Sequence, residues 1–391
     1  MEAFYKTHSH LLELLGNPVR RTLMDEVDWD ERVICIKGCR GVGKTTFLLH
    51  YAKEFFGRSK KCLYVNLDNF YFCHNRLTDF ADAFVAQGGT VLLIDGAGKY
   101  PGWTRDVKAC CEKHPSLRIV CAVSPVFDAD EDCHEINDIA KLYTLGGLTF
   151  REYLNLVTAA KHTVCSLDTL LADHDKVIAD VTRRIEPLDF FQNYLHHGYF
   201  PFLMEKKSHS ATLLKAVNMM IEVDILLARQ IEMKYLAKIR ALLYKLASAD
   251  SAAPVNISHL SDEVQASRAT VMNYLKYMDD AGLITMLYSE YDEYPKKPSQ
   301  IMIGNPNIQY AICHGSRQNV ANEIFAVNAL SSKHLINKDK RAAGYIIDNT
   351  WLLTFDKAGG NAKSTHCDAV FTHRANGESV RMPLWLLGFI D

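Results

Sequence analysis

The sequence decides its fold in one short stretch, Gly38-Cys39-Arg40-Gly41-Val42-Gly43-Lys44-Thr45, which has the G-x-x-x-x-G-K-[ST] spacing of a phosphate-binding loop. Glycine allows left-handed backbone angles, so successive N–H groups can turn inward around the phosphates of a nucleotide. We expect Lys44 to reach the β- and γ-phosphate oxygens and the Thr45 hydroxyl to ligate Mg²⁺. The predicted nucleotide-binding residues are Gly38, Arg40, Gly41, Val42, Gly43, Lys44, Thr45 and Thr46.

The sequence on either side of the loop supports this interpretation. Val33-Ile34-Cys35-Ile36 predicts a short buried strand before it, and the run from Thr46 to Lys53 predicts a helix after it. The N-terminus of that helix would face the phosphates. The alternative is a glycine-rich turn that binds nothing, and the strand, loop and helix in register argue against it.

Strand and helix patterns alternate from residue 31 to about 145, after two lead-in helices within residues 1–30. A continuous apolar run over Thr90–Ile94 is typical of a central parallel strand. Such alternation predicts a doubly wound parallel sheet. The other predicted strands are Lys61–Leu67 and Leu117–Val123, and the predicted helices are Thr78–Gln87 and Thr104–Lys113.

An acidic residue ends one of these strands. Asp95 follows the apolar run and lies 51 residues after Lys44. We expect it to hold Mg²⁺ together with Thr45, although a strand-end turn residue in Asp-Gly is the alternative. The next residue is Gly96, which has no side chain to polarise an attacking water.

Composition narrows the class of protein. The 391 residues predict two or three domains, and 46 acids against 44 bases, a net charge of −2, argue against a protein devoted to nucleic acid. Eleven scattered cysteines lack zinc-site spacing and suit a reducing cytoplasm. The apolar run Leu384–Ile390 is too short to span a bilayer. We therefore expect a cytoplasmic protein with no membrane partner.

Four domains are expected along the chain. Residues 1–148 predict the nucleotide-binding domain, and residues 149–250 contain only helical patterns, as in a lid or bundle. Residues 251–298 predict a winged helix, with Ser267 as the cap of its second helix and Gly282 as its end. Residues 299–391 predict a small mixed α/β domain.

Several blocks together resemble the bacterial and archaeal AAA-type P-loop ATPases with a C-terminal winged helix and a restriction-endonuclease-like terminal domain of unknown function. The resemblance covers most of the chain, and it implies ATP and Mg²⁺ as cofactors. Its landmarks are the loop at 38–45, Asp95 with Lys99-Tyr100-Pro101-Gly102-Trp103, Leu148-Thr149-Phe150-Arg151-Glu152-Tyr153-Leu154, Tyr194-Leu195-His196-His197-Gly198-Tyr199-Phe200-Pro201, and Met382-Pro383-Leu384-Trp385-Leu386-Leu387-Gly388-Phe389.

The departures from this pattern concern hydrolysis. The position of the family's catalytic glutamate is occupied by Gly96. Of the polar sensor residues that the family has after the next strand, only Ser124 is present here. The family's paired arginines correspond to Asp138-Ile139. An arginine finger accelerates phosphoryl transfer by several orders of magnitude. The resemblance therefore implies a site that clamps ATP and Mg²⁺ but hydrolyses ATP slowly or not at all. The alternative is substitution, with Asp68 orienting water and Arg105 or Arg151 reaching a phosphate.

The winged helix and the terminal domain are weaker candidates for chemistry. Nearby acids would repel phosphate, so packing is favoured over DNA binding, and three dispersed carboxylates are weak support for a nuclease. Candidate DNA contacts are Arg268, Thr270, Asn273, Lys276, Lys296 and Lys297; candidate nuclease carboxylates are Glu323, Asp348 and Asp356. The lysine expected near these carboxylates is not well placed, because Lys357 directly follows Asp356 and the related position reads Gly359-Gly360-Asn361.

The leading hypothesis is an ATP-binding switch with impaired hydrolysis. A second hypothesis is a working ATPase that moves a DNA-linked or nuclease-like terminal domain, and a third is a DNA-binding or nuclease module in which the nucleotide is structural. The expected partners are the nucleotide and either a second copy or another protein.

Overall fold

The computed structural model describes residues 1–126, 136, 138–204, 208–249, 255–339, 344–355, 367–373, 377 and 380–390. The chain forms two compact units, Met1–Gly147 (unit 1) and Leu148–Asp391 (unit 2). No helix in the described ranges is both long and apolar enough to cross a membrane.

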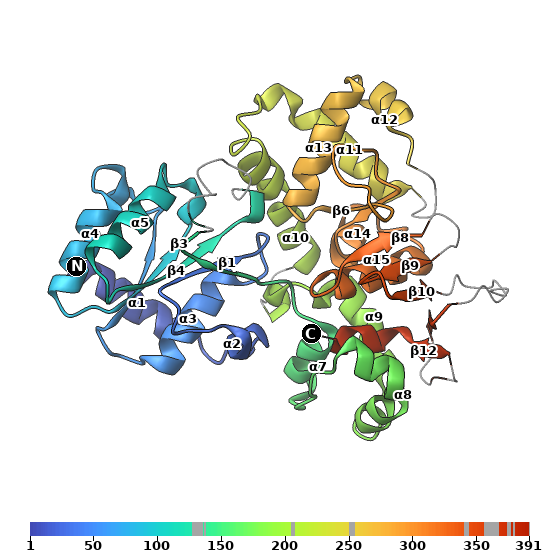
Figure 1. The fold of residues 1–391 in the computed structure, drawn as a ribbon, viewed down its shortest axis with the longest axis horizontal. Coiled ribbons are helices and arrows are strands. Elements are labelled where there is room, and N and C mark those ends of the chain that lie inside the picture. Colours follow the sequence, from blue (N-terminus) through green and yellow to red (C-terminus); the bar gives the residue numbers. More distant parts are fainter. Residues whose placement is uncertain are drawn as a thin grey trace. The chain divides into compact units, whose positions relative to one another are not determined.

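Unit 1 is built on a five-stranded, fully parallel sheet with the order β2-β3-β4-β1-β5 (Figure 1). Because all strands run the same way, the loops after β1, β2, β3 and β4 emerge at one edge. The strands are β1 (Val33–Lys37), β2 (Cys62–Asn66), β3 (Val91–Asp95), β4 (Arg118–Val123) and β5 (Lys141–Thr144); the helices are α1 (Glu2–Leu14), α2 (Leu23–Glu26), α3 (Lys44–Phe55), η1 (Phe70–Cys73), α4 (Leu77–Ala86), η2 (Ala97–Lys99) and α5 (Trp103–Lys113).

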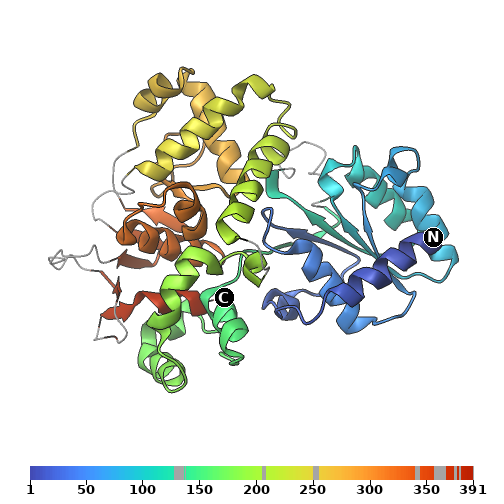
Figure 2. The ribbon, with the colours of Figure 1, turned by 180° about the vertical axis from the view of Figure 1, so that it is seen from behind.

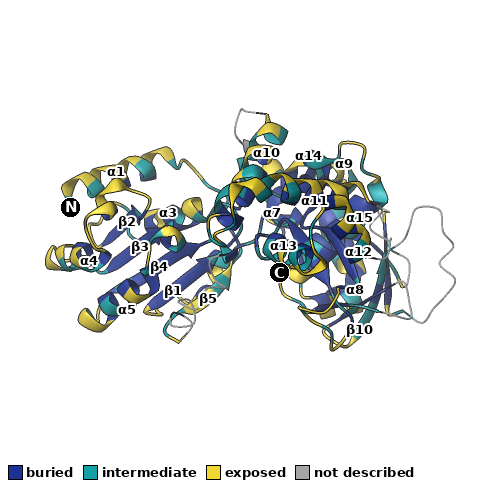
Figure 3. Ribbon diagram, turned by 90° about the horizontal axis from the view of Figure 1, so that it is seen from above, coloured by how far each residue is buried: buried dark blue, intermediate teal, exposed yellow. Residues whose placement is uncertain are grey.

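Helices cover both faces of this sheet, which explains why its central strands are apolar throughout. All five residues of β3 are buried, and Figure 3 shows the strands as a dark layer between helices. Helices α4 and α5 pack on one face through a cluster that includes Phe80, Phe84 and Val107. Helices α1 and α3 cover the other, and Figure 2 shows α1 lying across that side of unit 1. The predicted parallel α/β architecture of this part of the chain is confirmed.

Helix α1 also protects the sheet edge formed by β2. The ring of His8 is buried, and its Nδ1 accepts a hydrogen bond of 3.1 Å from the backbone N–H of Tyr64. Burial lowers the pKa of His8, which keeps this nitrogen free of a proton and able to accept. An edge-strand donor that would otherwise be left without a partner is thus satisfied.

The first half of unit 2 is helical. Thr149 and Glu152 form a capping box at the start of α7, so the Leu148–Leu154 block has a structural role as a helix start. The elements are α7 (Phe150–Thr158), α8 (Leu167–Thr182), α9 (Pro187–Asn193), η5 (Tyr194–Gly198), η6 (Pro201–Met204), α10 (His209–Met219), η7 (Met220–Ile225), η8 (Met233–Tyr235), α11 (Leu236–Ser248), α12 (Ile257–Val264) and α13 (Arg268–Asp280).

The second half of unit 2 contains two sheets. Strand β6 pairs with β7 in an antiparallel hairpin, so the expected domain boundary at residue 298 falls inside a paired unit. A mixed sheet follows with the order β12-β11-β10-β9-β8. The elements are β6 (Ile284–Leu287), β7 (Gln300–Ile303), α14 (Pro306–Ile312), α15 (Gln318–Ser331), β8 (Ile336–Lys338), β9 (Tyr345–Ile347), β10 (Trp351–Phe355), β11 (Ala369–Thr372), β12 (Arg381–Pro383) and η9 (Leu384–Phe389).

The C-terminal segment η9 packs into the core of unit 2, as its apolar sequence predicts. It lies beside α7 and α9 in Figure 1. A Cβ on Gly388 would lie 2.4 Å from the Cβ of Phe150, so the two backbones approach too closely for any larger residue. Phe389 adds an edge-to-face ring contact with Phe150.

A half-buried histidine, His209, makes the stability of unit 2 pH-dependent. The ring of His209 contacts those of His197 and Phe202, and neither ring nitrogen has a hydrogen-bond partner among the described residues. Burial, with a smaller contribution from His197, lowers its pKa to about 4. The unfolded side chain takes a proton near pH 6.5, so between these values the unfolded state binds more protons and stability falls as pH falls.

We expect about 1–2 kcal/mol of the unfolding free energy to disappear between pH 7 and pH 5 through this residue. His209→Phe should remove that part of the pH dependence, which urea unfolding at the two pH values measures. The exposed His259 gives the matched control His259→Phe, which should leave the dependence intact. Equal pH profiles for wild type and His209→Phe would contradict the assignment.

Candidate nucleotide site

The loop from Gly38 to Thr45 joins β1 to α3 and has the backbone geometry of a phosphate cradle. Gly41 and Gly43 adopt φ values of 93° and 97°, which only glycine takes without strain. A Cβ on Gly38 would lie 2.5 Å from the carbonyl oxygen of Leu145, so this glycine permits close approach of the backbone after β5. Helix α3 begins at Lys44, and its N-terminal N–H groups complete an anion-binding end.

Lys44 lies folded over the loop. Its Nζ donates to the carbonyl oxygens of Gly38 at 2.5 Å and Cys39 at 3.0 Å. A phosphate would offer this ammonium charge-assisted hydrogen bonds, which are about twice as strong as neutral ones. The contacts hold the lysine at the loop and present its charge where the phosphates are expected.

Thr45, in the first turn of α3 after β1, meets Asp95 at the end of β3, although β4 lies between β1 and β3 in the sheet. The Thr45 hydroxyl donates to Asp95 Oδ2 at 2.5 Å, and the Gly96 N–H donates to Asp95 Oδ1 at 2.9 Å. Asp95 is 8 % exposed, so these donors are needed to hold its charge. The predicted pair is therefore brought together.

The donor set at this point fits Mg²⁺. A hydroxyl and a carboxylate are hard oxygen ligands, and Mg²⁺ takes one or two protein ligands with the remainder from water and phosphate. Within the described ranges no group of three or more His, Cys, Asp or Glu residues could hold a metal, so no competing cage exists there. Thr45 and Asp95 are the residues that would hold the ion, which would neutralise phosphate charge.

Tyr64 is a site residue that the sequence reasoning missed. Its hydroxyl donates to Asp95 Oδ2 at 2.9 Å from the neighbouring strand β2. Burial, together with the adjacent Asp95 carboxylate, raises the pKa of the Tyr64 phenol, so it remains a donor. The alternation of side chains along a strand could have indicated Tyr64. Asn66 pairs with Asp95 in the parallel register, and Tyr64, two residues earlier on β2, lies on the same face of the sheet as Asn66.

Gly96 has a backbone that opposes any side chain. Its φ is 69°, and a Cβ there would lie 2.8 Å from Asn66 Oδ1. Gly102 has the same φ of 69° and nothing within 4 Å of its Cβ position. Both glycines precede a helical segment. Substitution of each by alanine therefore adds the same backbone strain, but only the substitution at Gly96 also adds crowding.

Gly102→Ala should lower the free energy of unfolding by about 1 kcal/mol through left-handed strain alone. Gly96→Ala should lower it by about 2–3 kcal/mol, because crowding against Asn66 adds to the strain. Chemical denaturation of the full chain measures both. Equal losses at the two positions would show that the space beside Gly96 is open.

The remaining candidates for hydrolysis are dispersed. Ser124 directly follows β4 and is partly buried, Arg105 is exposed on α5, and the Asp138-Ile139 pair supplies no cation. Arg151 is buried in unit 2, where its Nη1 donates to the His162 carbonyl oxygen at 3.4 Å. A phosphate role for Arg151 conflicts with this burial.

Arg21 is a second residue that the sequence reasoning missed, and it ties the phosphate loop to the end of unit 1. Its guanidinium is buried and donates to the carbonyl oxygens of Val42 at 3.1 Å, Gly146 at 2.8 Å and Gly147 at 2.7 Å. Val42 belongs to the loop, and Gly147 is the last residue of unit 1. A single side chain thus spans both segments.

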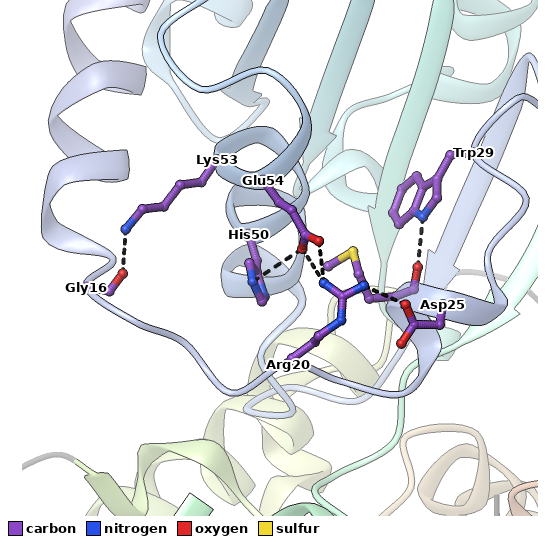
Figure 4. Close-up of polar contacts among 8 residues, drawn as sticks. Gly16, Arg20, Asp25, Trp29, His50, Lys53 and Glu54 are labelled. Carbon is purple, nitrogen blue, oxygen red and sulfur yellow. Dashed lines mark hydrogen bonds and ion pairs between the residues drawn. The ribbon is translucent and has the colours of Figure 1, made fainter. Parts of the chain in front are cut away.

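The segment that carries Arg21 is fastened to α3 by its neighbours. Figure 4 shows Arg20 between Glu54 of α3 and Asp25, with ion pairs to both. Figure 4 also shows Lys53 donating to the Gly16 carbonyl oxygen, at 2.5 Å. The ring of Trp29 stacks on Tyr51 with centroids 3.7 Å apart. The segment from Gly16 to Trp29 therefore packs on α3, the helix that follows the phosphate loop, and stabilises it.

The expected DNA-reading face of α13 is engaged within the chain. Asn273 Oδ1 accepts from the Tyr294 hydroxyl at 2.7 Å, Lys276 pairs with Asp280 at 2.6 Å, and Lys296 pairs with Asp292 at 2.9 Å. Arg268 and Lys297 are exposed, and Thr270 is half-buried. Acids beside these lysines weaken their attraction for phosphate, which favours a packing role.

The candidate nuclease carboxylates serve different partners. Glu323 Oε1 accepts from the Tyr345 hydroxyl at 2.5 Å, whereas Asp348 pairs with His334 at 2.6 Å and accepts from the Leu335 N–H. Two acids engaged in separate contacts do not form a shared metal site. Asp356, Lys357 and the Gly359-Gly360-Asn361 stretch lie outside the described residues.

Comparison with protein families identifies the class of unit 1. Residues 30–154 match the model described as an AAA domain, and the chain therefore contains an AAA-type domain. Residues 188–299 match a domain of unknown function (DUF8612), which begins within α9, continues to β6 and ends just before β7. No curated protein matches the chain.

Solved structures give weak overall likenesses. The Aeropyrum pernix ORC1 protein in complex with DNA is 9% identical with a TM-score of 0.31, over 80% of this chain and 92% of that one. AMPPCP-bound DnaA from Aquifex aeolicus is 13% identical with a TM-score of 0.28, over 68% of this chain and 86% of that one. Likenesses this weak carry no weight for function.

Proposed function

We propose that this chain is an ATP-binding AAA-type protein with weak or lost hydrolysis, which acts as a nucleotide-dependent switch. The observation that carries the proposal is the cradle of Gly38–Thr45 with Lys44 at its mouth and the Thr45–Asp95 pair beside it. ATP and Mg²⁺ are the ligands, and the AAA domain match supports ATP over GTP. The eleven cysteines are scattered along the sequence without zinc-site spacing, which supports a reducing compartment such as the cytoplasm.

Weak hydrolysis follows from two features of unit 1. Gly96 supplies no carboxylate after Asp95, and its crowded left-handed backbone would oppose one. The Asp138-Ile139 pair brings no arginine to neutralise charge on the transferring phosphate. Binding interactions are thus retained while those specific to the transition state are reduced, which gives affinity without fast turnover.

The switch is supported by the contacts behind the phosphate loop. Arg21 bonds both to Val42 in the loop and to Gly146 and Gly147, where unit 1 ends. The Leu145 N–H donates to the Lys37 carbonyl oxygen at 2.7 Å, directly before the loop. Bound phosphates would draw Lys44 away from the loop carbonyl oxygens and so alter the conformation of the loop. The contacts of Arg21 and Leu145 would transmit this conformational change to the end of unit 1, from which unit 2 continues.

For unit 2 we propose three parts: a helical region, a winged-helix module whose role is packing, and a terminal α/β region that has no nuclease activity. Residues 188–299, the domain of unknown function, would be what the nucleotide state acts on. A second copy or another protein is the proposed partner. The alternative of an active ATPase that drives a DNA-binding or nuclease-like region predicts DNA binding and fast turnover instead.

Paired measurements on one preparation test the proposal. Calorimetric titration with ATP and Mg²⁺ should give saturable binding, and phosphate release on the same sample should be slow compared with the roughly 1–100 s⁻¹ typical of kinases. Limited proteolysis with and without nucleotide should show a different cleavage pattern. Fast, DNA-stimulated turnover would favour the alternative, and absence of ATP binding would contradict the proposal.

A further inference from the structure

The turn after β2 places a carboxylate where the side chain of residue 96 would begin. A Cβ built on Gly96 would lie 3.5 Å from Asp68 Oδ2 and 2.8 Å from Asn66 Oδ1. The space beside the end of β3 is therefore not vacant. It is filled by two side chains from the neighbouring strand end, one of which is an acid.

Local contacts fix this carboxylate. Asn66 Oδ1 accepts from the Asp68 N–H at 2.8 Å, which forms a tight turn directly after β2. The Leu67 N–H donates to the Asp95 carbonyl oxygen at 2.9 Å, so the turn is tied to the end of β3. Lys99, three residues after Gly96, pairs with Asp68 Oδ2 at 2.8 Å. The turn is thus fixed through its backbone, and the carboxylate oxygen that faces Gly96 is paired with Lys99.

Asp95 cannot take the same role while it holds its present partners. Its Oδ2 accepts from Thr45 and Tyr64, and its Oδ1 accepts from the Gly96 N–H. By contrast, the Asp68 side chain is 46% exposed, and it is open to water. Of the two carboxylates at this edge of the sheet, that of Asp95 is therefore buried and hydrogen-bonded through both oxygens, whereas that of Asp68 is solvated.

We propose that Asp68 replaces the carboxylate missing at residue 96 and orients the attacking water in slow hydrolysis of ATP. This inference rests on the proposed binding of ATP at the Gly38–Thr45 loop. The water oxygen forms a bond to the γ-phosphorus as the bond from that phosphorus to the β–γ bridging oxygen breaks. The electron pair leaves with ADP, and the water proton passes to Asp68 and then to solvent. Lys99 is a positioning residue that aims the carboxylate.

Asp68→Asn is the central test. We expect kcat for phosphate release to fall at least tenfold, while the Kd for ATP stays within about threefold, because only the transition state uses the carboxylate. Asp68→Glu should keep part of kcat. Asp82→Asn is the matched control, since Asp82 of α4 also pairs with a lysine, Lys113, at 2.6 Å. It should leave kcat and Kd unchanged.

A binding readout accompanies the rates. ADP with aluminium fluoride mimics the transferring phosphoryl group, and Asp68→Asn should weaken its binding at least tenfold relative to ADP alone. Gly96→Glu should not raise kcat, because its side chain would collide with Asn66 and Asp68. Melting temperatures of all variants establish that each is folded.

The outcomes separate this inference from the proposed function. ATP binding with no turnover, or turnover that Asp68→Asn leaves unchanged, overturns the role of Asp68 and leaves the binding switch intact. Failure of the wild type to bind ATP overturns both. Loss of kcat in Asp68→Asn with unchanged ATP affinity, partial recovery in Asp68→Glu and weaker aluminium fluoride binding supports the role.

Discussion

Lys44→Ala should weaken ATP binding about 100-fold or more, the largest effect expected of a substitution in the site. The Lys44 ammonium lies at the phosphate loop and donates to the carbonyl oxygens of Gly38 and Cys39, at 2.5 and 3.0 Å. Charge-assisted bonds to phosphate contribute about 1.5–3 kcal/mol each, and 1.36 kcal/mol corresponds to a factor of ten. Isothermal titration with ATP and Mg²⁺, or the nucleotide-induced shift in Tm, measures the loss.

Lys53→Ala is the matched control for this prediction. Lys53 lies on the same helix, and its Nζ also donates to a carbonyl oxygen, that of Gly16 (Figure 4). Removing it costs the same charge and a similar contact away from the loop, so the affinity should change by less than about threefold. Similar losses in both variants would mean that α3 is merely destabilised. Unchanged affinity in Lys44→Ala would remove the loop as the binding site.

The phosphate loop and the sheet could be predicted because their signals are local. Apolar runs placed β3 and β4 within one residue of their observed starts, and the loop's glycines adopt the left-handed angles that its spacing requires. Parallel pairing then places strand ends at one edge, so the approach of Asp95 to Thr45 follows from the order of elements and motif context.

Other features depend on contacts between distant segments, which periodicity does not encode. Tyr64 resembles any buried strand residue until the register with β3 is known. The crowding at Gly96 comes from the conformation of the turn after β2, and β7 pairs with β6 across residue 298, where a domain boundary was expected. Arg21 is the clearest case, because its three acceptors lie 21, 125 and 126 residues away.

Arg21→Met should destabilise the protein by about 2–4 kcal/mol, since it leaves the buried carbonyl oxygens of Val42, Gly146 and Gly147 without this charged donor. Methionine keeps much of the volume, so packing alone does not explain such a loss. Urea unfolding of the full chain measures it. Arg20→Met is the control: Arg20 is 44% exposed, so its ion pairs should contribute at most about 1 kcal/mol.

The same variant tests whether the loop and the end of unit 1 are coupled. If Arg21 carries the nucleotide signal, Arg21→Met should still bind ATP, with affinity reduced by about tenfold or less because Lys44 and Thr45 remain. It should, however, lose the nucleotide-dependent change in proteolysis at saturating ATP. Arg20→Met should keep that change, because Arg20 pairs with Asp25 and with Glu54 of α3, whereas it is Arg21 that donates to Gly146 and Gly147. A proteolysis change preserved in Arg21→Met would place the coupling elsewhere, with the contact between Leu145 and Lys37 as the next element to alter.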